Sequence, residues 1–72
     1  MALDVSRYMV ALGNFYTQAS SWHAAKNDEE KLAVETEKLK EKAQTLLFEL
    51  EQLPPGIAGP GVMTHIKKVL SL

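Results

Sequence analysis

The sequence predicts an all-α fold, with an antiparallel helical hairpin and a short third helix in one domain over residues 1–72. Apolar residues recur at steps of three and four along two long segments, which places them on one side of an α-helix. A Pro/Gly loop at residues 54–61 separates the second segment from a shorter third one. A chain of 72 residues is short for more than one domain.

The first helix is expected over about residues 4–25. Its apolar stripe consists of Val5, Tyr8, Met9, Leu12, Phe15, Tyr16, Ala19 and Trp22. Asp4 or Ser6 is expected to cap its start by accepting free backbone N–H groups. No Asp, Glu, Lys or Arg occurs between Arg7 and Lys26, so the other face is small and uncharged and suits contact with another helix or chain.

The second helix is expected over about residues 28–53, after a polar stretch that interrupts the apolar stripe. Asn27 and Glu30 have the spacing of a capping box, which predicts a helix start near Asp28. The turn contains neither glycine nor proline, so one continuous helix through residues 4–53 remains an alternative.

Apolar positions in the second helix follow a heptad pattern typical of a coiled coil. They are Leu32, Thr36, Leu39, Ala43, Leu46, Leu50 and Leu53, with Leu47 widening the lower half. Mixed charges lie between them, and Glu35–Lys38 and Glu37–Lys40 are expected to pair weakly on the surface.

The third helix is expected over about residues 61–71, because Pro54 and Pro55 end the second helix and Pro60 suits a first turn. Its apolar positions are Val62, Ile66, Val69 and Leu70. Lys67 and Lys68 lie near its C-terminus, where cations interact favourably with the helix dipole.

The geometry predicts a partner for this chain. A second helix of this length extends ~38 Å, whereas a compact chain of this size has a radius of gyration of ~11 Å. We therefore expect an elongated molecule in which a short third helix covers only part of the hairpin. Since the chain has no cysteine for a disulfide, a homodimer forming a helical bundle or a larger protein partner is expected to cover the rest.

The expected function is non-catalytic protein binding, as an adaptor, chaperone or inhibitor. The candidate interface residues are Tyr8, Leu12, Phe15, Tyr16, Trp22, Val34 and Phe48. Aromatic residues dominate many interfaces, but a stripe at helical spacing usually faces its own domain, which favours a core role for most of the aromatic residues in the first helix. Phe48 and Val34 lie on the side of the second helix opposite the leucine positions. One interpretation is that they form a second contact surface for a partner. The other is that the third helix covers Phe48 and that Val34 is an isolated exposed apolar residue.

No cofactor or metal site is expected. His23 and His65 have no His, Asp or Glu three or four residues away on the same helix. Ser20, Ser21 and His23 are adjacent but lack the acidic residue that a catalytic triad would need.

Nucleic-acid binding is the alternative function. In this interpretation, a row of lysines on one face of the second helix contacts the phosphates of a duplex, together with two lysines of the third helix. The row consists of Lys31, Lys38 and Lys42, and the two further lysines are Lys67 and Lys68. The net charge of −1 and the interleaved Glu35, Glu37 and Glu41 weaken this interpretation.

Hydropathy predicts no membrane segment, since no run approaches ~18 apolar residues. The N-terminal residues lack the basic start and apolar run of a signal peptide. A cytoplasmic or other intracellular location is therefore expected.

Overall fold

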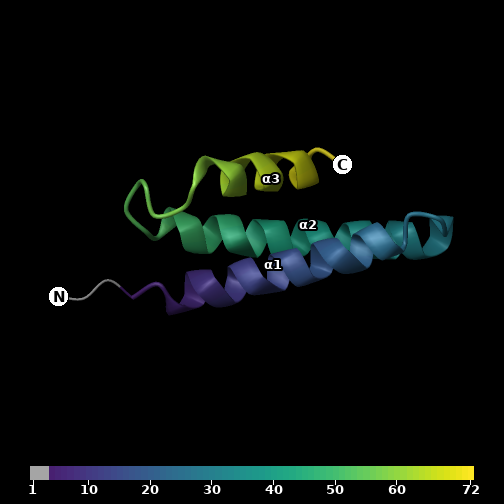
Figure 1. Cartoon of the computed structure of the whole chain (residues 1–72), viewed down its shortest axis with the longest axis horizontal. Helices are drawn as coiled ribbons and strands as arrows, with labels where there is room; N and C mark the ends of the chain where they lie inside the picture. Colours follow the sequence, from purple (N-terminus) through teal and green to yellow (C-terminus); the bar gives the residue numbers. More distant parts are fainter. Residues whose placement is uncertain (1–3) are drawn as a thin grey trace.

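The computed structural model describes residues 4–72 and contains three helices, α1 (Ser6–Ala24), α2 (Glu29–Glu51) and α3 (Pro60–Leu70) (Figure 1). These residues include no strand, so the predicted all-α fold is confirmed. Helices α1 and α2 pack together as an antiparallel hairpin, and α3 packs on α2. The predicted helix ends differ from the observed ones by one or two residues.

The turn between α1 and α2 spans residues 25–28, so the alternative of one continuous helix is wrong. The predicted capping box is also wrong, by one residue. Asp28 is the N-cap, and its carboxylate accepts a hydrogen bond from the backbone N–H of Lys31 at 3.2 Å. Glu29 and Glu30 consequently fall in the first turn of α2, where negative charge interacts favourably with the helix dipole.

The start of α1 is held by Asp4. The N-cap is Val5, which makes no side-chain cap hydrogen bond. The Asp4 carboxylate, one residue earlier, accepts a hydrogen bond from the backbone N–H of Ser6 at 2.9 Å, so Asp4 accepts a free N–H as predicted but is not the cap residue. This hydrogen bond is the main reason that the pKa of Asp4 lies below its ordinary value.

Replacing Asp28 with alanine is expected to lower the free energy of unfolding by about 0.5–2 kcal/mol, because the backbone N–H of Lys31 loses its acceptor. Thermal unfolding followed by circular dichroism measures the change. Asn27→Ala is the control and should leave the unfolding midpoint nearly unchanged, since the cap hydrogen bond comes from the next residue. Equal destabilisation by both substitutions would contradict the assignment of Asp28 as the cap.

The core lies along the line where α1 meets α2, with one side chain from α3. The buried residues that form one cluster are Tyr8, Ala11 and Phe15 of α1, Leu39, Ala43 and Leu46 of α2, and Ile66 of α3. The three from α2 are consecutive heptad positions, so the heptad marks the packing side of α2. Heptad positions nearer the helix ends are only half-buried; these are Leu32, Thr36, Leu50 and Leu53.

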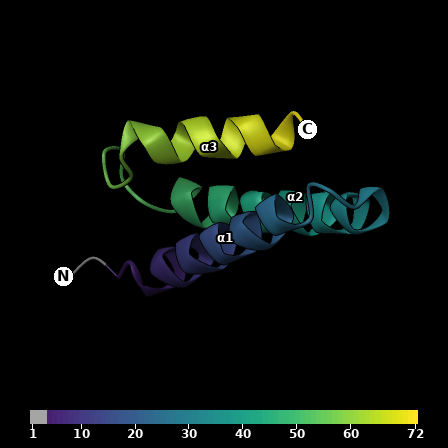
Figure 2. The same ribbon diagram turned by 45° about the vertical axis from the view of Figure 1, so that its right-hand side comes forward.

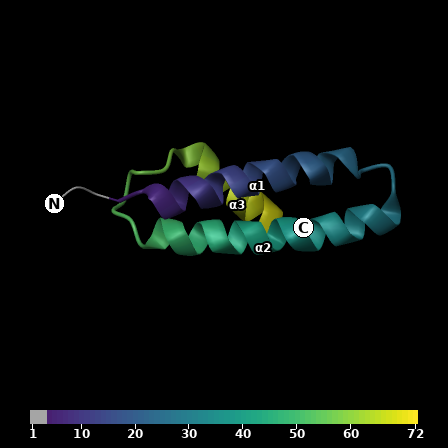
Figure 3. The same cartoon turned by 90° about the horizontal axis from the view of Figure 1, so that it is seen from below.

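The loop after α2 reverses the chain and returns α3 over the hairpin. Gly56 has a φ of 93°, a left-handed conformation that glycine adopts without steric cost. Pro60 is the first residue of α3, one residue before the predicted start and within the first turn as predicted, where a missing N–H removes no helical hydrogen bond. Helix α3 then runs antiparallel to α2 and lies over the line between α1 and α2 (Figure 3).

Helix α3 covers only part of the hairpin. Its 11 residues extend ~16 Å, against ~34 Å for the 23 residues of α2. It starts near the Pro/Gly loop and ends well before the turn between α1 and α2 (Figures 1 and 2). The molecule measures 48 × 19 × 15 Å with a radius of gyration of 13.1 Å, which confirms the predicted elongated shape.

Candidate protein-binding groove

A groove of about 410 Å³ lies between α1 and the C-terminal half of α3, with α2 at its base. Its lining is Phe15, Tyr16, Ala19, Trp22 and His23 from α1, Leu39 from α2, and His65, Lys68, Val69 and Leu72 from α3 and the residues after it. We call this space the α1/α3 groove. Most of its lining is apolar. It lies at the end of α3 that points toward the uncovered part of the hairpin (Figure 1).

The α1/α3 groove exists because α1 and α3 do not pack closely together. No Cα atom of α3 lies within 8 Å of one in α1, although both helices approach α2. Tyr16 and His65 bridge this separation: the Tyr16 Oη and the His65 Nδ1 are hydrogen bonded at 3.0 Å. Their rings meet edge to face, with centroids 5.8 Å apart. This pair fixes the spacing of α1 and α3 at the groove.

Trp22 forms a fixed part of the groove wall. Its Nε1–H donates a hydrogen bond to the Thr36 Oγ1 at 2.9 Å, which ties the indole to α2. The Lys26 Nζ lies 4.9 Å from the ring centroid, at cation–π distance. Because the indole is held before any ligand arrives, binding against it would sacrifice little side-chain entropy.

The two helices that form the walls of the groove, α1 and α3, differ from α2 in their charged residues. Neither α1 nor α3 contains an Asp or Glu, whereas α2 contains seven Glu residues among its 23. The groove lining includes Lys68, His23 and His65, and no acidic side chain. The α1/α3 groove therefore combines an apolar surface with basic groups around it.

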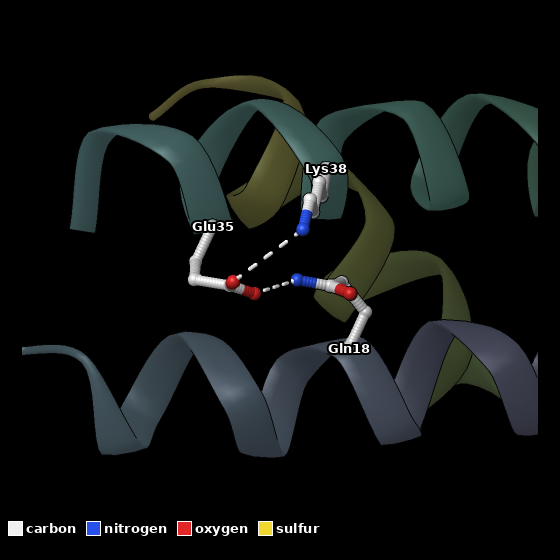
Figure 4. Close-up of polar contacts among 3 residues, drawn as sticks. All are labelled: Gln18, Glu35 and Lys38. Atoms are coloured by element: carbon white, nitrogen blue, oxygen red, sulfur yellow. Dashed lines mark hydrogen bonds and ion pairs between the residues drawn. The ribbon is translucent and has the colours of Figure 1, made fainter. Parts of the chain in front are cut away.

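A polar network joins α1 to α2 through Gln18, Glu35 and Lys38 (Figure 4). The Gln18 Nε2 donates a hydrogen bond to one Glu35 oxygen, and the Lys38 Nζ lies 3.8 Å from the other. The predicted Glu35–Lys38 pair is therefore confirmed. As an exposed pair it contributes little stability, but it neutralises one lysine of the predicted phosphate-binding row.

The lysines predicted to contact phosphates are divided between α2 and α3. Lys31, Lys38 and Lys42 are exposed and share a face of α2 by their spacing. Lys67 and Lys68 belong to α3, and Lys68 lines the α1/α3 groove instead.

The predicted protein-interface residues divide into three groups. Tyr8 and Phe15 are buried in the core of their own chain, which is the second interpretation that the sequence allowed. Leu12 and Trp22 are half-buried beside that core, and Tyr16 is 39% exposed. Of these α1 residues, Phe15, Tyr16 and Trp22 meet at the α1/α3 groove.

Val34 and Phe48 lie elsewhere, on the outer side of α2. They are 54% and 60% exposed, respectively, so the interpretation that α3 covers Phe48 is wrong. Phe48 instead borders a separate depression with Arg7, Tyr8 and Leu53. The structure does not bring Val34 or Phe48 into the groove.

The sequence did not predict that the C-terminal segment forms a wall of the groove, through His65, Lys68 and Val69 of α3 and Leu72 after it. The sequence indicates Val69 as an apolar position and Lys68 as a phosphate contact, and it gives His65 no metal-binding role. The apolar spacing of α3 was the available signal, but it does not specify which part of the hairpin α3 covers.

Within residues 4–72, no three His, Asp or Glu side chains are grouped closely enough to hold a metal ion. None of the helices in this range is long and apolar enough to cross a membrane. Comparison of the chain with protein-family models, curated proteins and solved structures found no match.

Proposed function

We propose that this chain is a small, non-catalytic protein-binding module of the cell interior that takes up an apolar helical segment of a partner protein in the α1/α3 groove. The observation that carries the proposal is a mostly apolar groove between α1 and the C-terminal half of α3, with Trp22 held in its wall. A partner helix there would cover the hairpin face much as α3 covers the neighbouring part. Insertion of an apolar helix face into such a groove is a common mode of peptide recognition.

Burial of apolar surface supplies the driving force in this proposal, at roughly 25 cal/mol per Å² removed from water. Tyr16, Trp22 and Val69 are the contact residues from the two walls. Their rings and branched side chains lose few rotamers on binding, so more of the burial energy remains as affinity.

The test uses a peptide of about 15 residues with a leucine/alanine face and an uncharged glutamine/serine face. Binding should shift the amide signals of Tyr16 and Val69 and the indole signal of Trp22, which is the only tryptophan in the chain. Ala19→Phe fills the groove and should weaken binding about tenfold, a loss of about 1.4 kcal/mol.

Ser20→Phe is the matched control, because Ser20 is the exposed neighbour of Ala19 and does not line the groove. It should leave the affinity unchanged. Absence of binding, or shifts confined to other surfaces, would contradict the proposed function.

The homodimer expected from the sequence is a separate proposal that concerns the outer side of α2. Val34 and Phe48 are exposed there, fourteen residues and therefore ~21 Å apart along one face. Light scattering after gel filtration, repeated for a Val34→Ser/Phe48→Ser variant, tests it. If the wild-type protein is a monomer even at high concentration, the homodimer proposal is wrong.

Nucleic-acid binding remains the alternative proposal, and the common face of Lys31, Lys38 and Lys42 supports it. The Glu35–Lys38 pair weakens it. Binding to generic duplex RNA or DNA that falls steeply with added salt would favour it.

A further inference from the structure

We infer that the partner segment for the α1/α3 groove is an acidic amphipathic helix, with carboxylates flanking its apolar face. This inference rests on the proposed function and adds the chemical class of the partner. Two observations lead to it: the length of hairpin that α3 leaves uncovered next to the α1/α3 groove, and the sign of the charges that line the groove itself.

The hairpin length that α3 leaves uncovered, next to the α1/α3 groove, matches a helix of a few turns. The difference in length between α2 and α3 is ~18 Å, which corresponds to about 12 residues of helix. Helix α3 shows the pattern that this surface requires, because Ile66 is buried on the hairpin with Val62 and Val69 half-buried on either side. A partner helix therefore needs apolar residues at the same steps of three and four.

The charges favour carboxylates on such a helix. Lys68 is exposed at the groove, His23 and His65 line it, and Lys26 lies over the Trp22 ring. No acidic side chain lines the groove to neutralise them. Acidic groups of a docked helix would pair with Lys68 and Lys26, whereas basic groups would meet like charge there.

Exposed ion pairs of this kind contribute little affinity individually, so the carboxylates act mainly on selectivity and association rate. The net charge of the whole chain has the opposite sign to the charges that line the groove. At −1 it would slightly favour a basic peptide over an acidic one. A preference for acidic peptides would therefore report the local charge of the groove rather than that of the molecule.

The experiment compares three peptides with one leucine/alanine face and a polar face of glutamate, glutamine or lysine. We expect the glutamate peptide to bind most tightly and the lysine peptide about tenfold more weakly, with the Trp22 indole signal shifting in each complex. The difference should shrink as salt is raised. Lys68→Glu should reduce or reverse the preference, and Lys68→Gln should reduce it.

Lys42→Glu is the matched control, because it makes the same charge change at an exposed lysine of α2 that does not line the groove. It should preserve the order of the three peptides. Equal affinities in the groove, or tighter binding of the lysine peptide there, would overturn the acidic-helix inference and leave the proposed function intact. Failure of all three peptides to reach the groove would overturn both.

A second copy of the chain is the competing occupant. If light scattering shows a dimer that Ala19→Phe abolishes and Ser20→Phe preserves, the groove is filled by the chain itself. That result would overturn the inference of an acidic partner helix.

Discussion

Replacing Leu46 with alanine is expected to lower the free energy of unfolding by about 2–5 kcal/mol. Leu46 is fully buried between the helices and lies in the same row as Leu39 and Ala43. Truncation removes burial of its methyl groups and leaves a space that the surrounding helices fill only partly. A domain of this size rarely has more than about 3–5 kcal/mol of stability, so much of the variant should be unfolded at 25 °C.

Urea unfolding followed by the helical circular dichroism signal measures this loss. Val34→Ala is the matched control on the same helix, because Val34 is 54% exposed. Its effect should be within about 0.5 kcal/mol. Similar stability of the Leu46 variant and the wild type would contradict the placement of Leu46 in the core.

The helices and their packing sides could be predicted from the sequence, because both depend on local spacing. Leu39, Ala43 and Leu46 are buried where the heptad pattern predicted contact. The N-cap was predicted one residue early, since Asn27 and Asp28 are adjacent and either side chain can accept a backbone hydrogen bond. The choice depends on where the chain leaves α1, which local spacing does not determine.

The α1/α3 groove could not be predicted, because it depends on where α3 lies on the hairpin. Tyr16 and His65, which bridge it, are 49 residues apart in the chain. Phe48 shows the same limit: its exposure follows from the side of α2 that α3 occupies, and the heptad pattern alone left both outcomes open. Contacts between the first and last helices are set by tertiary packing rather than by the periodicity of either helix.

The attachment of α3 should depend strongly on one side chain. Ile66 is the only α3 residue in the buried core, at 1% exposure. An isolated helix of 11 residues is too short to be stable in water, so α3 stays helical through its contact with the hairpin. Ile66→Ala removes the one fully buried side chain of that contact, at a loss of about 2–5 kcal/mol.

We therefore expect the α3 amides of the Ile66→Ala variant to exchange hydrogen much faster than in the wild type, and faster than the amides of Leu39 and Ala43 in the same variant. Thr64→Ala is the control, because Thr64 is exposed and its hydroxyl donates only to the Pro60 carbonyl within α3. Unchanged protection of α3 in the Ile66 variant would contradict this dependence. Since Val69 and Leu72 form one wall of the α1/α3 groove, the same substitution should also weaken peptide binding, although it changes no residue of the groove lining.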